Sequence, residues 1–104
     1  MLTTEIELTI LLEDCQTADY MDGKDCPLCR AVKRVVKDNF YVVIGCMGII
    51  LIHDRKPEVM EGWETYQRTI LYTTYARDFN FLIVRDAKEN FTRKVSLPIE
   101  MLKQ

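Results

Sequence analysis

The feature that most constrains the fold of this chain is a pair of β-branched and aromatic runs, residues 40–44 and 49–53, joined by Gly-Cys-Met-Gly. Two such runs around a short glycine-containing turn predict an antiparallel β-hairpin. Both faces of the predicted strands are apolar, although packing against helices buries only one face of a sheet. The other face is expected to meet a second layer, a second copy of the chain or a partner protein. The residues expected to do so are Tyr41, Val43, Ile50 and Ile52, or the set opposite them.

Further strands are predicted on both sides of this hairpin. Near the start of the chain, apolar residues occupy every second position of residues 6–12, which is the period of a strand with one buried face. Residues 79–84 and 91–97 predict two more strands around a polar turn. Between the first strand and the first helix, residues 13–24 mix acids with turn formers and predict an exposed acidic loop.

Two helices are predicted. The first begins at Pro27, because Asp25 is a plausible cap and proline fits the first helical turn. Its apolar residues keep helical spacing, and a basic stripe on the other side is expected to face solvent. The stripe consists of Arg30, Lys33, Arg34 and Lys37. The second helix covers residues 57–78, although the β-branched and aromatic residues 69–75 would also suit a strand.

These elements fit one domain covering residues 1–104. A chain of 104 residues with 48% hydrophobic composition is large enough to close a single core. We therefore expect an α+β fold in which one mainly antiparallel sheet of about five strands has two helices packed on one face. The net charge of −2 argues against nucleic-acid binding as the main function of the chain.

The chain is expected to be cytoplasmic. Its first residues are acidic and alternate with apolar ones, unlike the basic and then continuously apolar start of a secretory signal. Its longest apolar run is interrupted by glycines and is shorter than a membrane helix requires. In a reducing compartment the cysteines are expected to be thiols or metal ligands rather than disulfides.

Cys26 and Cys29 have the spacing of half a zinc site or of a redox dithiol. A zinc site needs two more ligands, and only Cys15, Cys46 and His53 are available as soft or imidazole donors. Buried thiols without a cofactor are the first expectation, so no cofactor is predicted. The alternative is a small zinc-binding domain, serving as a nucleic-acid adaptor.

The segment Asp-Cys-Pro-Leu-Cys-Arg-Ala-Val-Lys-Arg, residues 25–34, resembles a run found in small uncharacterised proteins encoded by bacteriophages. The closing residues 91–98 are similar to the last strand of that group, which follows a hairpin and a helix. Cys29 stands where those proteins carry alanine. The resemblance implies a phage gene product, and small acidic phage proteins are often inhibitors of host machinery or host defence. It carries no catalytic residue over to this chain.

No catalytic constellation is recognisable. His53 is the single histidine, and the motifs of serine hydrolases and phosphate-binding loops are missing. Tyr72 and Tyr75 are expected on the exposed side of the second helix, where tyrosine often anchors an interface. The function expected is therefore a non-enzymatic protein-binding module that docks through an apolar sheet face or the tyrosine-bearing helix. The partner is a host protein or a second copy of the chain, and the charge asymmetry of the chain, basic stripe included, orients the encounter.

Overall fold

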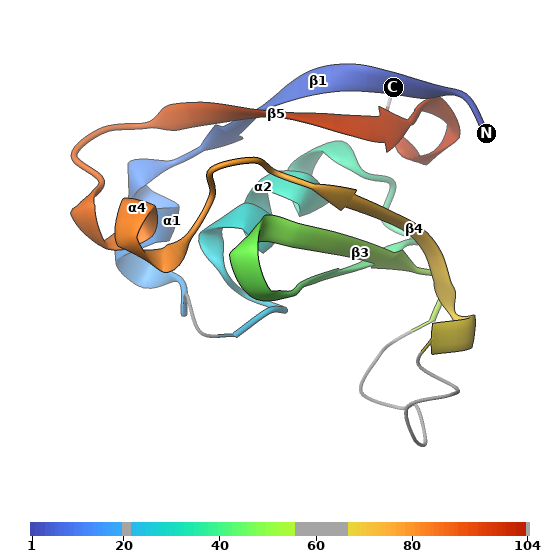
Figure 1. Cartoon of the computed structure of the whole chain (residues 1–104), viewed down its shortest axis with the longest axis horizontal. Coiled ribbons are helices and arrows are strands. Elements are labelled where there is room, and N and C mark those ends of the chain that lie inside the picture. The colour runs from blue at the N-terminus through green and yellow to red at the C-terminus, as the bar shows by residue number, and fades with distance from the viewer. Residues whose placement is uncertain (20–21, 56–66, 104) are drawn as a thin grey trace.

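The structure is a computed structural model that describes residues 1–19, 22–55 and 67–103, with the side chain of Cys46 left out. Within these residues, strands in two small antiparallel sheets pack with short α-helices into one α+β unit (Figure 1). The strands are β1 (Thr3–Ile10), β2 (Tyr41–Ile44), β3 (Ile49–His53), β4 (Ile70–Tyr75) and β5 (Phe91–Pro98). The α-helices are α1 (Leu12–Thr17), α2 (Pro27–Val35) and α4 (Phe81–Asp86).

The predicted hairpin is confirmed. β2 and β3 pair antiparallel, and the turn between them places Met47 at φ 58° and Gly48 at φ 80°. Left-handed backbone of this kind favours glycine, and at Gly48 space favours it as well. A Cβ atom there would lie 2.5 Å from the carbonyl oxygen of Ala76, so the turn can close only around a residue without a side chain.

The register of the hairpin shows that the four residues expected on one face lie on opposite faces. Directly paired residues point to the same side of a sheet, and Val42 pairs with Ile52. Ile50 and Ile52 are fully buried in the core, whereas Tyr41 and Val43 point to the other side and are only half-buried. The expectation failed because side chains alternate along each strand, and the turn length sets which residues of the two strands share a face.

The predicted single sheet is wrong in one respect, because the strands divide into two sheets of order β1-β5 and β2-β3-β4. A continuous sheet would need backbone hydrogen bonds between β4 and β5. The structure gives instead a side-chain contact, in which the Tyr72 hydroxyl donates to the carbonyl oxygen of Ser96 at 3.0 Å. As far as the described residues go, β4 and β5 therefore each have one unpaired edge, and these two edges face each other.

Three of the predicted elements take another form. Residues 12–17, expected as the end of the first strand and the start of the acidic loop, fold as α1. The backbone N–H of Leu12, the first residue of this helix, donates to Asn90 Oδ1 at 2.7 Å, from a turn far away in the sequence. The expected strand 79–84 is replaced by α4, because Asn80 caps that helix by accepting from the N–H groups of Leu82 and Ile83. Strand β4 occupies part of the expected second helix, and residues 57–66 of that prediction lie outside the described residues.

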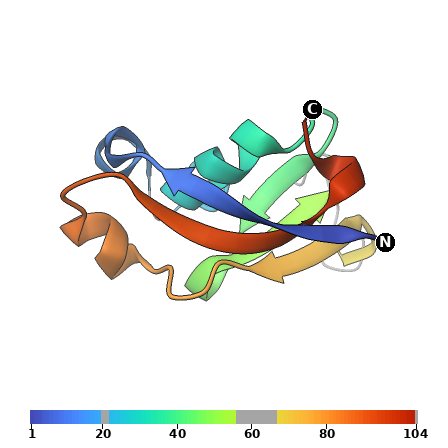
Figure 2. The same ribbon diagram turned by 90° about the horizontal axis from the view of Figure 1, so that it is seen from above.

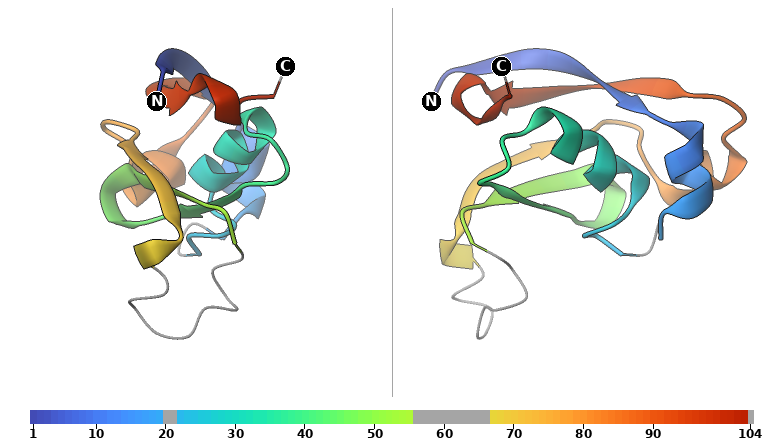
Figure 3. Two further views of the ribbon diagram at one scale, coloured as in Figure 1. Left: turned by 90° about the vertical axis from the view of Figure 1, so that its right-hand side faces the viewer. Right: turned by 180° about the vertical axis from the view of Figure 1, so that it is seen from behind.

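The core lies between the two sheets. Helix α2 packs against β1 on one side and β2 on the other, and its residues Leu28, Cys29 and Val32 are fully buried (Figures 2 and 3). The predicted start of this helix at Pro27 is confirmed, but its N-cap is Cys26 and not the expected Asp25. In the described part of the chain, no helix is long and apolar enough to cross a membrane.

Candidate functional site

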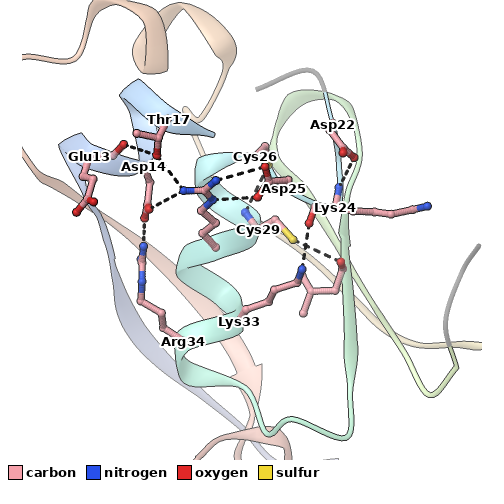
Figure 4. A network of polar contacts seen from close by, with 12 residues as sticks. Glu13, Asp14, Thr17, Asp22, Lys24, Asp25, Cys26, Cys29, Lys33 and Arg34 are labelled. Atoms are coloured by element: carbon pink, nitrogen blue, oxygen red, sulfur yellow. Dashed lines mark hydrogen bonds and ion pairs between the residues drawn. The ribbon is translucent and has the colours of Figure 1, made fainter. Parts of the chain in front are cut away.

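A polar network joins α1 to α2, and it accounts for most of the basic stripe (Figure 4). Asp14 of α1 is almost fully buried, and its carboxylate forms ion pairs with Arg30 and Arg34 of α2. Arg30 also donates to Asp25 at 3.0 Å and to the Thr17 hydroxyl at 3.0 Å. The acidic segment and the basic helix are thus each other's partners.

This network corrects the expectation of a freely solvated basic stripe. Lys33 Nζ donates to the carbonyl oxygen of Lys24 at 3.0 Å, so it too is engaged within the chain. Lys37 lies beyond the end of α2 at Val35 and is not part of the helical face. The Arg30 guanidinium lowers the pKa of Asp25, which stabilises the charged form of both groups. The stripe therefore has a structural role, and little of its charge remains for a partner.

Cys26 and Cys29 lie at the start of α2, and both are buried. The Cys26 sulfur accepts from the N–H of Cys29 at 3.4 Å, and the Cys29 thiol donates to the carbonyl oxygen of Val42 at 3.4 Å. Burial raises the pKa of Cys26, and it raises the pKa of Cys29 to about 12. Zinc binding and redox exchange both need the thiolate, which this environment disfavours. Among the described residues, no group of three or more suitable side chains is placed to hold a metal ion.

His53 is fully buried at the end of β3. Its Nδ1 lies 3.0 Å from the hydroxyl of Thr69, and burial lowers the pKa of the imidazole, which favours the neutral ring. The adjacent Asp54 is exposed, and its backbone N–H donates to the carbonyl oxygen of Thr69. The geometry therefore ties His53 to the strand junction rather than to a catalytic pair with Asp54.

The three-stranded sheet has a largely apolar face that does not pack on the core. Val43 pairs with Leu51, and Ile49 pairs with Tyr75, so these side chains lie together on the side opposite the buried Ile50 and Ile52. Tyr75 is 58% exposed and Leu71 is 41% exposed, which are high values for large side chains in strands. We call this surface the outer sheet face; it consists of Tyr41, Val43, Ile49, Leu51, Leu71, Thr73 and Tyr75.

The two tyrosines expected on a helix lie on β4 and point to opposite sides. Tyr72 pairs with Ile52, packs against the core and uses its hydroxyl to reach Ser96. Tyr75 points outward and belongs to the outer sheet face. Of the predicted contact residues, the structure therefore brings Tyr41, Val43 and Tyr75 onto one surface and removes Tyr72 from it.

A cavity of about 480 Å³ lies at the turn of the β2–β3 hairpin, next to the start of α2 and α4. Ile44, Met47, Phe79, Phe81 and Val84 give it mostly apolar walls. Among the described side chains that line it, Cys26 is the one titratable group, and burial raises its pKa. The cavity can accept an apolar group, but its walls supply no acid or base for catalysis.

The sequence predicted contact residues on the hairpin but did not single out Leu51 or Leu71. Leu71 belongs to the outer sheet face only because β4 is a strand, and the sequence of residues 69–75 suited either element. Leu51 belongs to it through its pairing with Val43 in the hairpin. No family model, curated protein or solved structure matches the chain.

Proposed function

We propose that the chain is a non-enzymatic protein-binding module that docks on a partner through the outer sheet face. The observation that carries the proposal is the composition of this face: apart from Thr73 and the fully buried His53, which pairs with Tyr41, its side chains are aliphatic or those of tyrosine. Burial of such side chains against a partner is worth roughly 25 cal/mol for each Å² of apolar surface removed from water. Tyrosine, present on this face as Tyr41 and Tyr75, is among the residue types that most often carry binding energy.

The buried side of the same sheet supports the assignment. Val42, Ile50 and Ile52 already supply the hydrophobic contacts that hold the sheet on the core. The half-buried Val43, Ile49 and Leu51 do not pack against that core cluster. Their apolar character is thus not required by the packing of the sheet on the core, and contact with another molecule is a physical reason for it.

The class of partner follows from the resemblance of residues 25–34 to bacteriophage proteins. Under this proposal the partner is a host protein with an apolar surface, and binding inhibits that protein. The zinc-binding alternative receives no support from the geometry, since both thiols of the Cys26–Cys29 pair are buried, hydrogen-bonded and held in the protonated form.

The test is a paired-variant capture experiment. Leu51→Thr/Leu71→Thr removes two apolar side chains from the outer sheet face while keeping strand propensity. The matched control, Leu2→Thr/Ile99→Thr, removes two side chains that are 80% and 52% exposed elsewhere on the chain. A partner captured from host lysate is purified, and its affinity for both variants is measured by calorimetry.

The proposal predicts that the outer-face variant binds at least about 10-fold more weakly, a loss of about 1.4 kcal/mol, while the control stays within about twofold. Equal affinities of the two variants would exclude the outer sheet face as the docking surface. Sedimentation of the purified chain tests the self-association alternative, because a dimer abolished by Leu51→Thr/Leu71→Thr would make the partner a second copy.

A further inference from the structure

The two free strand edges border a groove. This groove is distinct from the outer sheet face, and Tyr75 is the one described residue that belongs to both. Within the described residues, β4 pairs only with β3 and β5 pairs only with β1. A groove of about 570 Å³ lies along β5 and the end of β4, and its lining includes Thr92, Arg93 and Lys94. Open strand edges of this kind are templates for an added strand.

The direction of the backbone groups on β5 follows from one side-chain contact. Ser96 is paired with Glu5 of β1, yet its carbonyl oxygen accepts from the Tyr72 hydroxyl on β4. Backbone groups of alternate residues in an antiparallel pair point to alternate sides. Thr92 and Lys94 therefore direct their N–H and C=O groups toward β4 as Ser96 does. This is the side on which a further strand would form its hydrogen bonds.

Arg93 occupies the core-facing side of β5 without a carboxylate partner in the described part of the chain. Its guanidinium lies 4.8 Å from the centre of the Phe91 ring, and its Nη1 donates to the carbonyl oxygen of Thr92 at 2.8 Å. Its Nε is buried and has no hydrogen-bond partner among the described residues. A buried donor left without an acceptor is destabilising, so an incoming acceptor would relieve a cost that the free chain carries.

The groove also has a surplus of positive charge. Arg77, Arg93 and Lys94 line it together with two acids, Glu5 and Asp78. Glu5 and Lys94 lie 4.0 Å apart and are both well exposed, so their interaction is weak and easily exchanged. Arg77 is exposed and forms no ion pair with another described residue. A carboxylate entering the groove would thus meet arginine donors that no acid of the described residues occupies.

We propose that this groove binds an extended acidic peptide segment of a partner protein, which adds to the free edge of β5 and places a carboxylate on Arg93. The main-chain groups of Thr92 and Lys94 pair with the peptide, and alternate side chains of the peptide point toward the arginines. Arginine binds a carboxylate through two parallel hydrogen bonds, which would satisfy the buried Nε.

An extended peptide fits the groove better than nucleic acid does. Two strand edges supply a row of main-chain hydrogen-bond donors and acceptors. A phosphate backbone offers acceptors only, so it cannot pair with both kinds of group. The chain as a whole is acidic, with a net charge of −2, which repels a polyanion at longer range. A short peptide segment with one or two carboxylates is repelled much less than a polyanion.

The probe is a six-residue peptide, acetyl-Thr-Glu-Val-Glu-Val-Thr-amide, compared with its counterpart in which glutamine replaces both glutamates. Binding to the full chain is followed by two-dimensional amide NMR and by amide hydrogen exchange. We expect saturable binding of the acidic peptide and slower exchange at Thr92 and Lys94. Arg93→Gln should weaken binding about 10-fold, and Lys88→Gln, an exposed control outside the groove lining, should leave it within about twofold.

Arg77→Gln is the second variant, because an exposed arginine can be replaced without loss of fold, and it should also weaken binding. Equal binding of the glutamine peptide or unchanged amide exchange at β5 would overturn the proposal. So would a lack of saturation at about 1 mM peptide, a concentration on the order of the dissociation constants of weak domain–peptide complexes. Tighter, Arg93-dependent binding of single-stranded DNA would overturn it in favour of a phosphate ligand. The Leu51→Thr/Leu71→Thr variant should bind the peptide normally, so this proposal and the docking of the outer sheet face can fail separately.

Discussion

Neutralising Arg30 and Arg34 together should destabilise the chain through Asp14. The Asp14 side chain is 9% exposed, whereas those of Arg30 and Arg34 are 32% and 39% exposed. Arg30→Gln/Arg34→Gln leaves the carboxylate buried without a cation. Removing the partner of a fully buried charge costs roughly 3 to 5 kcal/mol. Because water reaches the arginine side of this site, we expect a loss of about 2 to 4 kcal/mol in the free energy of unfolding.

The same reasoning predicts a rescue. Adding Asp14→Asn to the double variant removes the stranded charge, and the triple variant should regain at least about half of the lost stability. Urea unfolding followed by circular dichroism measures all three proteins. A loss below about 0.5 kcal/mol in the double variant would mean that the network contributes nothing measurable. A triple variant as unstable as the double variant would show that the cost does not come from Asp14.

Three further predictions test the packing and the buried thiol. Ile52→Ala should cost about 2 to 5 kcal/mol because it empties a core site, and Val43→Ala on the outer sheet face should cost about 1 kcal/mol or less; similar costs in urea unfolding would refute the register. Gly48→Ala should cost about 1 to 3 kcal/mol, since it forces a Cβ against the Ala76 carbonyl at φ 80°; a neutral effect on thermal unfolding would contradict the turn geometry. Burial raises the pKa of Cys29 from 9.0 to about 12, so its contribution to stability is complete below about pH 9 and is lost as the pH rises toward 12. Relative to Cys29→Ala, the parent chain should lose roughly 1 kcal/mol per pH unit in that window, and parallel pH profiles would show that the thiol is not buried.

The parts of the fold that local pattern determines were predictable. Alternation along residues 3–10, the glycine turn between β2 and β3, and proline at the start of α2 each depend on neighbours within a few residues. The parts set by distant contacts were not. The capping of α1 by Asn90 joins residues 78 positions apart, and the burial of Asp14 requires two arginines from another helix.

The candidate site shows the same division. The apolar character of the hairpin identified Tyr41 and Val43 as contact residues, because both faces of the strands were visibly apolar. Their grouping with Leu71 and Tyr75 depends on the pairing of β3 with β4, and residues 69–75 carry a composition that suits helix and strand alike. The gap between β4 and β5 has no local signal, since it depends on how two sheets diverge.

Side-chain oxidation footprinting of the chain, free and bound to its captured partner, tests the central claim most directly. Hydroxyl radicals label exposed aromatic and aliphatic side chains, and mass spectrometry measures the labelling of each residue. The account predicts that Leu71 and Tyr75, exposed by 41% and 58% in the free chain, lose most of their labelling on binding, while Phe81, exposed by 53%, keeps its own. Unchanged labelling of Leu71 and Tyr75 together with protection of Phe81 would contradict it and move the docking surface to the hairpin-turn cavity.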